Sequence, residues 1–426
     1  MRSFATDGDL RLLAWQRVRE FAVPPAMIET ATARRAVGDW AGACAAARVD
    51  AELDLRTVAW RHGRELASRI RDDLHHLVPD LLRWHFPRVA PDGLLRPAVT
   101  VALARYGPMD LVARTAPAWA DAGQRVSLTV WERAGPAYPR PSRRFRFDLH
   151  RHLWDARRVT DLGVRAGVAS WPGSASARVA GLPDGCAVHR WAAEAVLVRT
   201  AEGRPEDPVL IRPGSRLRVV VAPPADAGGA AWRIVDNAEA TWPVLPDAAA
   251  WVLPDLELLR AGLIEPGRLH PVVAAALAPG HRPRRPDPPD APRRVRCRGA
   301  EHRIGLVAGV LSPLDHDSDE LRREELLVAL GGTPLPCLQV IDEVNRNPQG
   351  LADIRARLDH GDMAGALAAV EYLLGPAALL RTGPLRDALA AAAERRITYG
   401  LYRAGLLGRR IRRQVPPQGR RLRPIR

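Results

Sequence analysis

The chain has 426 residues, a formal net charge of +15 and 63 basic residues of the Lys-plus-Arg class. All 63 are arginine, so chemistry that needs a Schiff-base lysine or a phosphate-binding P-loop lysine is excluded. Asparagine is also scarce, which indicates a GC-rich genome and means that part of the arginine excess reflects codon usage.

The length predicts two or three domains, and a hydrophobic content of 47% is enough for packed cores. The first residues contain no apolar run, and the sequence contains no membrane span, so no membrane partner is expected. Four cysteines lie far apart, without any CxxC spacing, at Cys44, Cys186, Cys297 and Cys337. These features predict a cytoplasmic protein with reduced thiols.

Residues 1–92 are predicted to form a helical domain. Leu66, Ile70, Leu74 and Leu77 fall on one stripe of a helix that Pro79 ends or kinks. An upstream helix opens at Pro24-Pro25 and closes at Gly38, and the residue after this glycine is suited to cap the next helix. The pattern is typical of a helical hairpin.

The same hairpin pattern recurs near the other end of the chain. Residues 38–46 (GDWAGACAA) match residues 361–369 (GDMAGALAA) at seven of nine positions. In both, a helix ends at glycine, aspartate caps the next helix, and small residues allow close approach. The unit resembles the helix-turn-helix of tetratricopeptide-type repeats, over one turn only. Because it occurs twice and without a 34-residue period, it does not predict a repeat array.

From about residue 96 to 240 the apolar period changes to two, which is typical of β-strands. Pro/Gly pairs separate the alternating segments, as at Gly107-Pro108 and Pro213-Gly214. The predicted strands are centred on Val99–Leu103, Val126–Val130, Phe145–Leu149 and Leu217–Val221. Residues 93–280 are therefore predicted to be a mainly antiparallel β domain, sandwich or barrel-like, that ends in helices at about 246–278.

The remainder of the chain is divided by composition. Residues 281–294 are rich in proline and charge and predict a stiff linker. Residues 295–408 are predicted to hold a β-hairpin followed by a helical domain, and residues 409–426 form an Arg-rich tail. The expected fold class is α+β, with helical domains at both ends of a central β domain.

One candidate catalytic or metal-binding group lies in the predicted strand 144–152. On a strand, Asp148, His150 and His152 would project from one face, as ligands of one metal must. The competing interpretation, which we favour, is a solvated polar stripe on an edge strand.

A second candidate metal group combines Cys297, His302, His316 and Cys337, enough ligands for tetrahedral zinc, although the spacing fits no compact zinc finger. Buried thiols and surface histidines are the competing interpretation. Residues 315–320 (DHDSDE) begin like an EF-hand loop but lack its required Gly and Glu, so capping of the following helix is the better interpretation. The His316-Asp317 pair resembles HD-type phosphohydrolases, but their further ligands are not found. No cofactor is predicted beyond this possible zinc.

The tail concentrates the charge. Residues 403–426 hold nine arginines and no acid. Arginine suits phosphate recognition, so the tail predicts sequence-indifferent binding to nucleic acid or to an acidic partner, with an inert, codon-biased tail as the alternative. The predicted nucleic-acid contacts are Arg409, Arg410, Arg412, Arg413, Arg420, Arg421 and Arg423.

The sequence contains none of the GxSxG, HExxH, GxGxxG or CxxC motifs. We therefore expect a non-catalytic cytoplasmic interaction or adaptor protein with a protein partner. The alternative is a metal-dependent hydrolase or nuclease that uses the Asp148, His150 and His152 face.

Overall fold

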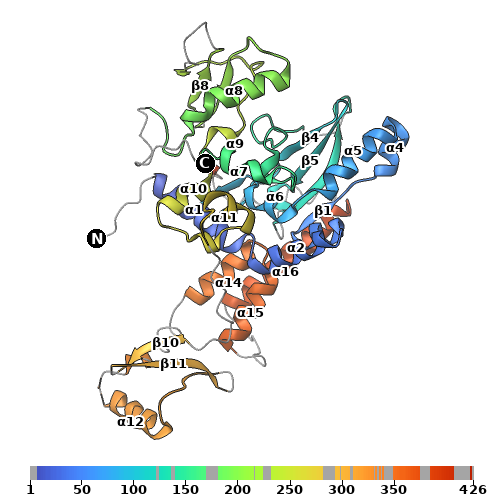
Figure 1. Ribbon diagram of the computed structural model, residues 1–426. Helices are drawn as coiled ribbons and strands as arrows, with labels where there is room; N and C mark the ends of the chain where they lie inside the picture. Colours follow the sequence, from blue (N-terminus) through green and yellow to red (C-terminus); the bar gives the residue numbers. More distant parts are fainter. Residues whose placement is uncertain are drawn as a thin grey trace. The chain divides into compact units, whose positions relative to one another are not determined.

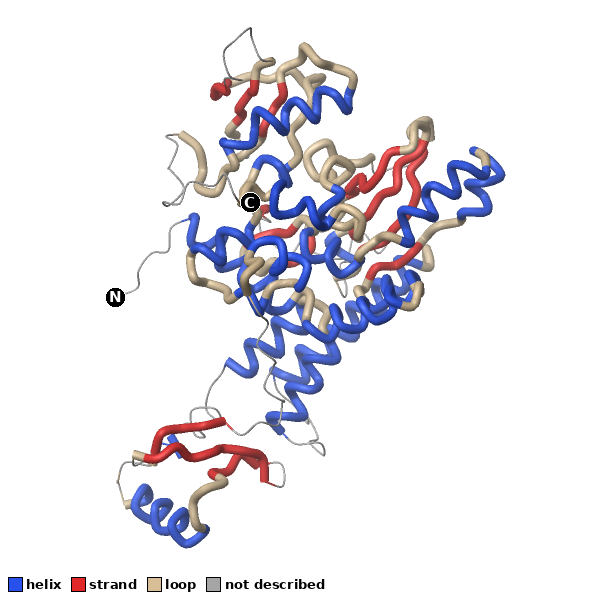
Figure 2. The backbone as a smooth tube through the Cα atoms, in the orientation of Figure 1, coloured by secondary structure: helices blue, strands red, loops and turns tan. Residues whose placement is uncertain are grey.

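The computed structural model describes residues 7–120, 124–135, 140–168, 181–214, 216–223, 232–281, 293–297, 299–307, 310–330, 332, 335–336, 338–339, 349–374, 384–406 and 423–424. The chain divides into two compact units. Unit 1 contains residues 1–282 and 395–426, and unit 2 contains residues 283–394. The fold mixes helices with several small sheets and begins with helices, as predicted, and none of the described sheets closes into a barrel (Figures 1 and 2).

The first part of unit 1 is helical. Its elements are α1 (Asp7–Phe21), α2 (Pro25–Ala36), α3 (Trp40–Ala46), β1 (Val49–Ala51), α4 (Leu55–His62), α5 (Arg64–His75) and α6 (Pro79–His85). Within α5 the predicted stripe is confirmed, because Ile70 and Leu74 are buried and Leu66 is partly buried. The helix ends at His75, before Leu77, so the prediction that it extends to Pro79 was wrong. Gly63, at φ +94°, separates α4 from α5, and Pro79 begins α6 because proline suits the first turn of a helix.

A four-stranded sheet follows these helices in the sequence. It has the order β1-β6-β5-β4, with β4 (Thr100–Arg105), β5 (Met109–Thr115) and β6 (Val126–Glu132) antiparallel and β1 parallel to β6. The predicted strands at Val99–Leu103 and Val126–Val130 are thus confirmed. A second sheet joins β2 (Arg88–Ala90), β3 (Leu94–Leu95) and β13 (Arg423–Pro424), so the end of the chain pairs with a strand near residue 90.

The rest of unit 1 alternates short helices with a third sheet. This sheet contains β7 (Val209–Ile211), β8 (Arg218–Val221) and β9 (Trp232–Val235), all antiparallel, and confirms the predicted strand at Leu217–Val221. The helical elements are η1 (Ala118–Ala120), η2 (Arg151–Leu153), η3 (Val159–Asp161), α7 (Leu162–Arg165), α8 (Val188–Glu202), α9 (Asp247–Ala250), α10 (Pro254–Arg260), η4 (Pro266–Arg268) and α11 (Pro271–Leu277). The helices expected at about 246–278 are therefore present.

One cluster of buried apolar side chains contains residues from Ala14 in α1 to Leu277 in α11. Trp84, Leu103 and Leu111 lie in it and are at most 1% exposed. Residues on both sides of position 92 contribute to this core, and the sequence-based domain boundaries remain predictions. A smaller cluster packs α8 against the third sheet through Trp191 and Val219.

Unit 2 contains a sheet and helices. Its elements are β10 (Arg293–Cys297), β11 (Ala300–Val307), β12 (Val310–Pro313), α12 (Ser318–Ala329), α14 (Gln349–Asp359), α15 (Met363–Leu374) and the first part of α16 (Pro384–Arg403). The strands pair antiparallel in the order β10-β11-β12, which confirms the predicted hairpin. Most of the predicted linker, residues 281–294, lies outside the described residues.

The repeated hairpin has the same geometry in both units. Asp39 accepts a hydrogen bond from the backbone nitrogen of Gly42 at 2.8 Å, and Asp362 accepts one from Gly365 at 3.2 Å. A Cβ on either Gly42 or Gly365 would lie 2.1 Å from the capping carboxylate. The glycine is thus required by the cap itself, which explains why the two nine-residue segments share it.

Candidate interaction surface

The predicted strand 144–152 is absent from the structure, and this prediction was wrong. The segment makes one isolated bridge, from Arg146 to Ala102, and then turns into η2. The reason is that its polar residues form buried ion pairs. The prediction had placed them on a solvated face. Arg146 is 1% exposed and pairs with Asp148 and with Glu202 of α8.

Asp148 is held by arginines. Arg146 donates Nε and Nη2 to its two oxygens at 2.7 and 2.6 Å, and Arg105 lies 2.9 Å away. Although burial alone would raise its pKa, the hydrogen bonds and charges of these arginines hold the pKa of Asp148 below its usual value. Both oxygens that a metal would need are already engaged.

His150 and His152 are buried, so the solvated-stripe interpretation is contradicted. The Nε2 of His150 lies 3.2 Å from Glu194, and the two imidazole rings are 5.8 Å apart at a steep angle. Burial is the main cause that lowers the pKa of both histidines, which favours neutral rings at pH 7. The two side chains lie close together, as predicted. Their neighbour Glu194 belongs to α8, and the sequence pattern did not indicate this contact.

The candidate zinc ligands are brought together in part. His302 and His316 stack with ring centroids 4.2 Å apart, and Cys297 is buried. Cys337 lies outside the described residues. Within the described ranges, no group of three or more His, Cys, Asp or Glu side chains is arranged to hold a metal ion. Asp317 occupies the N-cap position of α12 but its side chain makes no capping hydrogen bond, and Asp319 and Glu320 lie in the first turn of the helix, as expected.

Six of the seven predicted nucleic-acid contacts, Arg409 to Arg421, lie outside the described residues. Arg423 is in β13, where its backbone pairs with Ala90. No helix in the described part of the chain is both long and apolar enough to cross a bilayer.

An open groove of about 670 Å³ separates α5 from the η2 region. Asp73 and Asp155 lie in it and bind Arg151 and Arg157, with Arg151–Asp155 at 2.7 Å and Arg157–Asp155 at 2.9 Å. The phenol of Tyr106 donates to Asp73. These arginines are bound to carboxylates, so the groove is a structural ion-pair network.

A different surface is formed by the helical hairpin of α4 and α5. Trp60 of α4 is 84% exposed, which is the second highest exposed fraction among the described large apolar side chains after Leu330. Arg56 lies four residues before it on the same helix face, and Arg61 follows it directly with a side chain 54% exposed. The helix itself is anchored, because Val58 is buried and His62 lies 3.3 Å from Glu132 of β6.

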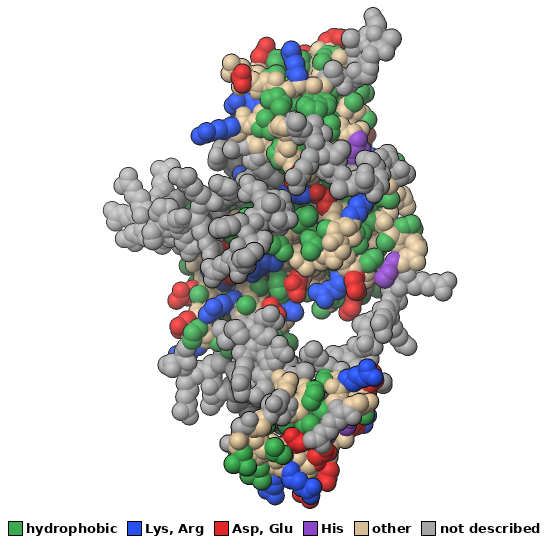
Figure 3. Space-filling model, turned by 90° about the vertical axis from the view of Figure 1, so that its left-hand side faces the viewer, with side chains coloured by type: hydrophobic (Ala, Val, Ile, Leu, Met, Phe, Trp, Pro, Cys, Tyr) green, Lys and Arg blue, Asp and Glu red, His purple; other side chains and the backbone are tan. Residues whose placement is uncertain are grey.

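Sequence reasoning missed Trp60, although a signal was present. The buried residues of α5 form one stripe along that helix. Trp60 lies in α4, before the glycine that separates the two helices, and is not part of the stripe. A tryptophan that lies outside a buried stripe and next to arginines is typical of a binding surface. On the described face in Figure 3, acidic and basic side chains are interspersed with apolar ones.

No protein-family model matches the chain, no curated protein sequence matches it, and no solved structure matches it.

Proposed function

We propose that the protein is a non-catalytic interaction protein that binds an acidic partner protein on α4, through Trp60 and its neighbouring arginines. The observation that carries the proposal is the 84% exposure of Trp60 on an anchored helix. Burying a tryptophan releases much apolar surface from water, and tryptophan and arginine are the residues most enriched at the energetic centres of interfaces.

Charge favours an acidic partner. Within α4 (Leu55–His62) the charged side chains are Arg56 and Arg61. Arg61 lies 3.5 Å from Glu132 of β6, whereas none of the described carboxylates forms an ion pair with Arg56. A partner that offers carboxylates beside an apolar side chain would pair with both features at once. The Arg-rich tail adds a second, sequence-indifferent contact with polyanions, in keeping with the same function.

The test compares Trp60→Ala with Val164→Ala, which changes another strongly exposed apolar side chain, 83% exposed. An aromatic-containing Glu/Asp peptide and its Lys/Arg counterpart serve as probes in fluorescence anisotropy. We expect binding of the acidic peptide, a loss of about tenfold or more in Trp60→Ala, and none in Val164→Ala. Equal binding of both peptides, or equal binding by both variants, would remove the proposal.

A metal-dependent hydrolase is the second candidate. The observation that favours it is the proximity of His150 and His152, whose ring centroids are 5.8 Å apart. Elemental analysis of the purified protein, before and after exposure to zinc and manganese, tests it. Stoichiometric metal that His152→Gln abolishes would favour the hydrolase over the interaction protein.

A further inference from the structure

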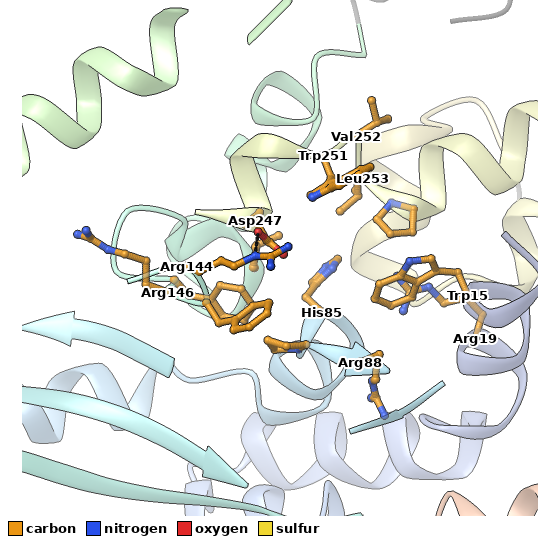
Figure 4. Close-up of a pocket in the computed structure, with 16 residues that line it drawn as sticks. Trp15, Arg19, His85, Arg88, Arg144, Arg146, Asp247, Trp251, Val252 and Leu253 are labelled. Atoms are coloured by element: carbon orange, nitrogen blue, oxygen red, sulfur yellow. Dashed lines mark hydrogen bonds and ion pairs between the residues drawn. The ribbon is translucent and has the colours of Figure 1, made fainter. Parts of the chain in front are cut away.

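A cavity of about 90 Å³ lies within unit 1, away from α4, between α1, the end of α6, the segment 144–153 and the α9–α10 region. Figure 4 shows His85 near its middle, with the Arg144–Asp247 pair on one side, Trp15 on the other and Trp251 near the upper end of the imidazole. The remaining walls include Phe145 and Phe147. The lining of the cavity thus combines aromatic and aliphatic side chains with several arginines, one histidine and one aspartate.

The polar side chains that line this cavity carry nitrogen atoms, apart from the carboxylate of Asp247. Five of these nitrogen atoms are buried and have no hydrogen-bond partner among the residues that the structure describes: Trp15 Nε1, His85 Nε2, Arg88 Nε, Arg144 Nη2 and Trp251 Nε1. Both tryptophans are more than nine-tenths buried, at 7% and 6% exposed. Native proteins pair nearly all such groups, so five around one cavity indicate a missing ligand.

The chemistry of these atoms specifies what is missing. An indole N–H and a guanidinium N–H can only donate, and a neutral imidazole can present an N–H at Nε2. The cavity thus has donors in excess and lacks acceptors. A ligand that satisfies it must bring acceptor oxygens, and a carboxylate has the most acceptor capacity for its size.

The charges around the cavity favour an anion. Arg144 is balanced by Asp247, at 2.6 Å, and Arg19 by Asp255, at 2.7 Å. Arg88 is 1% exposed and bonds backbone carbonyls, and none of the described carboxylates forms an ion pair with it. Burial, with a smaller effect of Arg19, lowers its pKa to about 9, so a nearby negative charge would stabilise it.

His85 is in the same environment. Burial, followed by the charge of Arg19 and the neighbouring His152 and His270, holds its pKa well below 6.5. The imidazole is therefore neutral at pH 7 and keeps one ring N–H to donate.

We propose that this cavity binds a small planar aromatic carboxylate, with its ring against the Trp and Phe walls and its carboxylate accepting hydrogen bonds from Arg144, His85 and the indole N–H of Trp251. This site is independent of the α4 surface. The aromatic walls favour a flat ring over a branched chain.

Calorimetric titration of the full chain with four probes tests the proposal: benzoate, its neutral analogue benzamide, non-aromatic cyclohexanecarboxylate, and inorganic phosphate. We expect one benzoate per chain and an affinity at least about tenfold weaker for each other probe, since each lacks the charge or the ring. Comparable binding of benzamide would show an apolar pocket, and comparable binding of phosphate an anion site without an aromatic requirement. Either result, or no benzoate binding at millimolar concentration, overturns the proposal.

Two matched variants locate the site. Trp251→Phe keeps an aromatic ring and removes one unpaired donor, so benzoate affinity should fall by about five- to tenfold without loss of thermal stability. Trp191→Phe removes an indole N–H that already bonds Ala250 at 3.0 Å, so stability should fall and affinity should not change. If the two variants alter affinity equally, benzoate binds elsewhere and the assignment fails.

Discussion

Arg19 of α1 donates Nε and Nη2 to the two oxygens of Asp255 in α10, at 2.8 and 2.7 Å. The side chains are 1% and 0% exposed, and Trp84 donates its indole N–H to the same carboxylate at 3.0 Å. Two helices separated by 236 positions are thus joined by a fully buried ion pair.

Arg19→Met should lower the free energy of unfolding by about 3–5 kcal/mol, because it leaves Asp255 buried without its counter-charge. The double variant Arg19→Met/Asp255→Leu should recover much of that loss, since neither charge then remains. Urea unfolding followed by circular dichroism measures both. Arg158→Met, at an exposed pair with Asp161, is the control and should change stability by less than about 1 kcal/mol. A double variant as unstable as Arg19→Met would contradict the argument.

The cap at Asp39 makes a second prediction. Gly42→Ala should destabilise unit 1 by about 1 kcal/mol, because the new Cβ would displace the capping carboxylate. In an Asp39→Ala background the same change should stabilise by about 0.5–1 kcal/mol, since alanine is the better helix former. The sign reversal should recur with Asp362 and Gly365 in unit 2. Thermal unfolding of the single and double variants measures it, and additive effects would refute it.

Three buried histidines make stability depend on pH. Burial lowers the pKa of His85, His150 and His152 below the unfolded value of about 6.5. Below pH 6.5 the unfolded chain therefore binds protons that the folded chain does not, and stability falls as the pH falls. Each such histidine adds a slope of about 1.4 kcal/mol per pH unit. Carboxylates whose pKa is lowered, such as Asp148, lose their contribution only below about pH 4.

Urea titrations from pH 7 to pH 5 should show this slope, and His152→Gln should reduce it by about one proton. His281→Gln, at an exposed position, is the control and should leave the slope unchanged. A stability that is flat across this range would show that the folded protein admits protons to these rings.

The Arg-rich tail predicts a salt-dependent contact with polyanions. If about five arginines neutralise phosphates of duplex DNA, the log–log salt slope should be roughly −4 to −5. Changing the six arginines from Arg409 to Arg421 to Gln should flatten it while keeping β13, which pairs with β2. Titrations with random duplex at several salt concentrations measure the slopes. Identical slopes would assign the arginine excess to codon usage.

Local signals carried most of what the sequence predicted correctly. The repeated hairpin could be recognised because the cap needs Asp and Gly at fixed positions. Three strands could be recognised because apolar residues alternate with small or polar ones along them. The strand prediction for residues 144–152 was wrong for a physical reason. Alternation of charged and apolar residues is the same whether the charges face water or, like Arg146, pair with a partner from a distant helix.

The cavity could not be predicted from the sequence. Its tryptophans, Trp15 and Trp251, come from segments far apart in the chain, and neither has a motif around it. What marks the site is the lack of acceptors around their indole nitrogens, which exists only after folding.

Unit 1 is formed from two stretches of chain, and this sets an order of events during synthesis. Asp50 of β1 is bound by Arg125, but its second partner, the phenol of Tyr399, is made 349 residues later. At ribosomal rates this interval is roughly 20–70 s. The free edge of β2 likewise waits for β13. The segment that completes unit 1 therefore follows all of unit 2 in the chain, so the unit whose synthesis begins first is the last to receive all its residues.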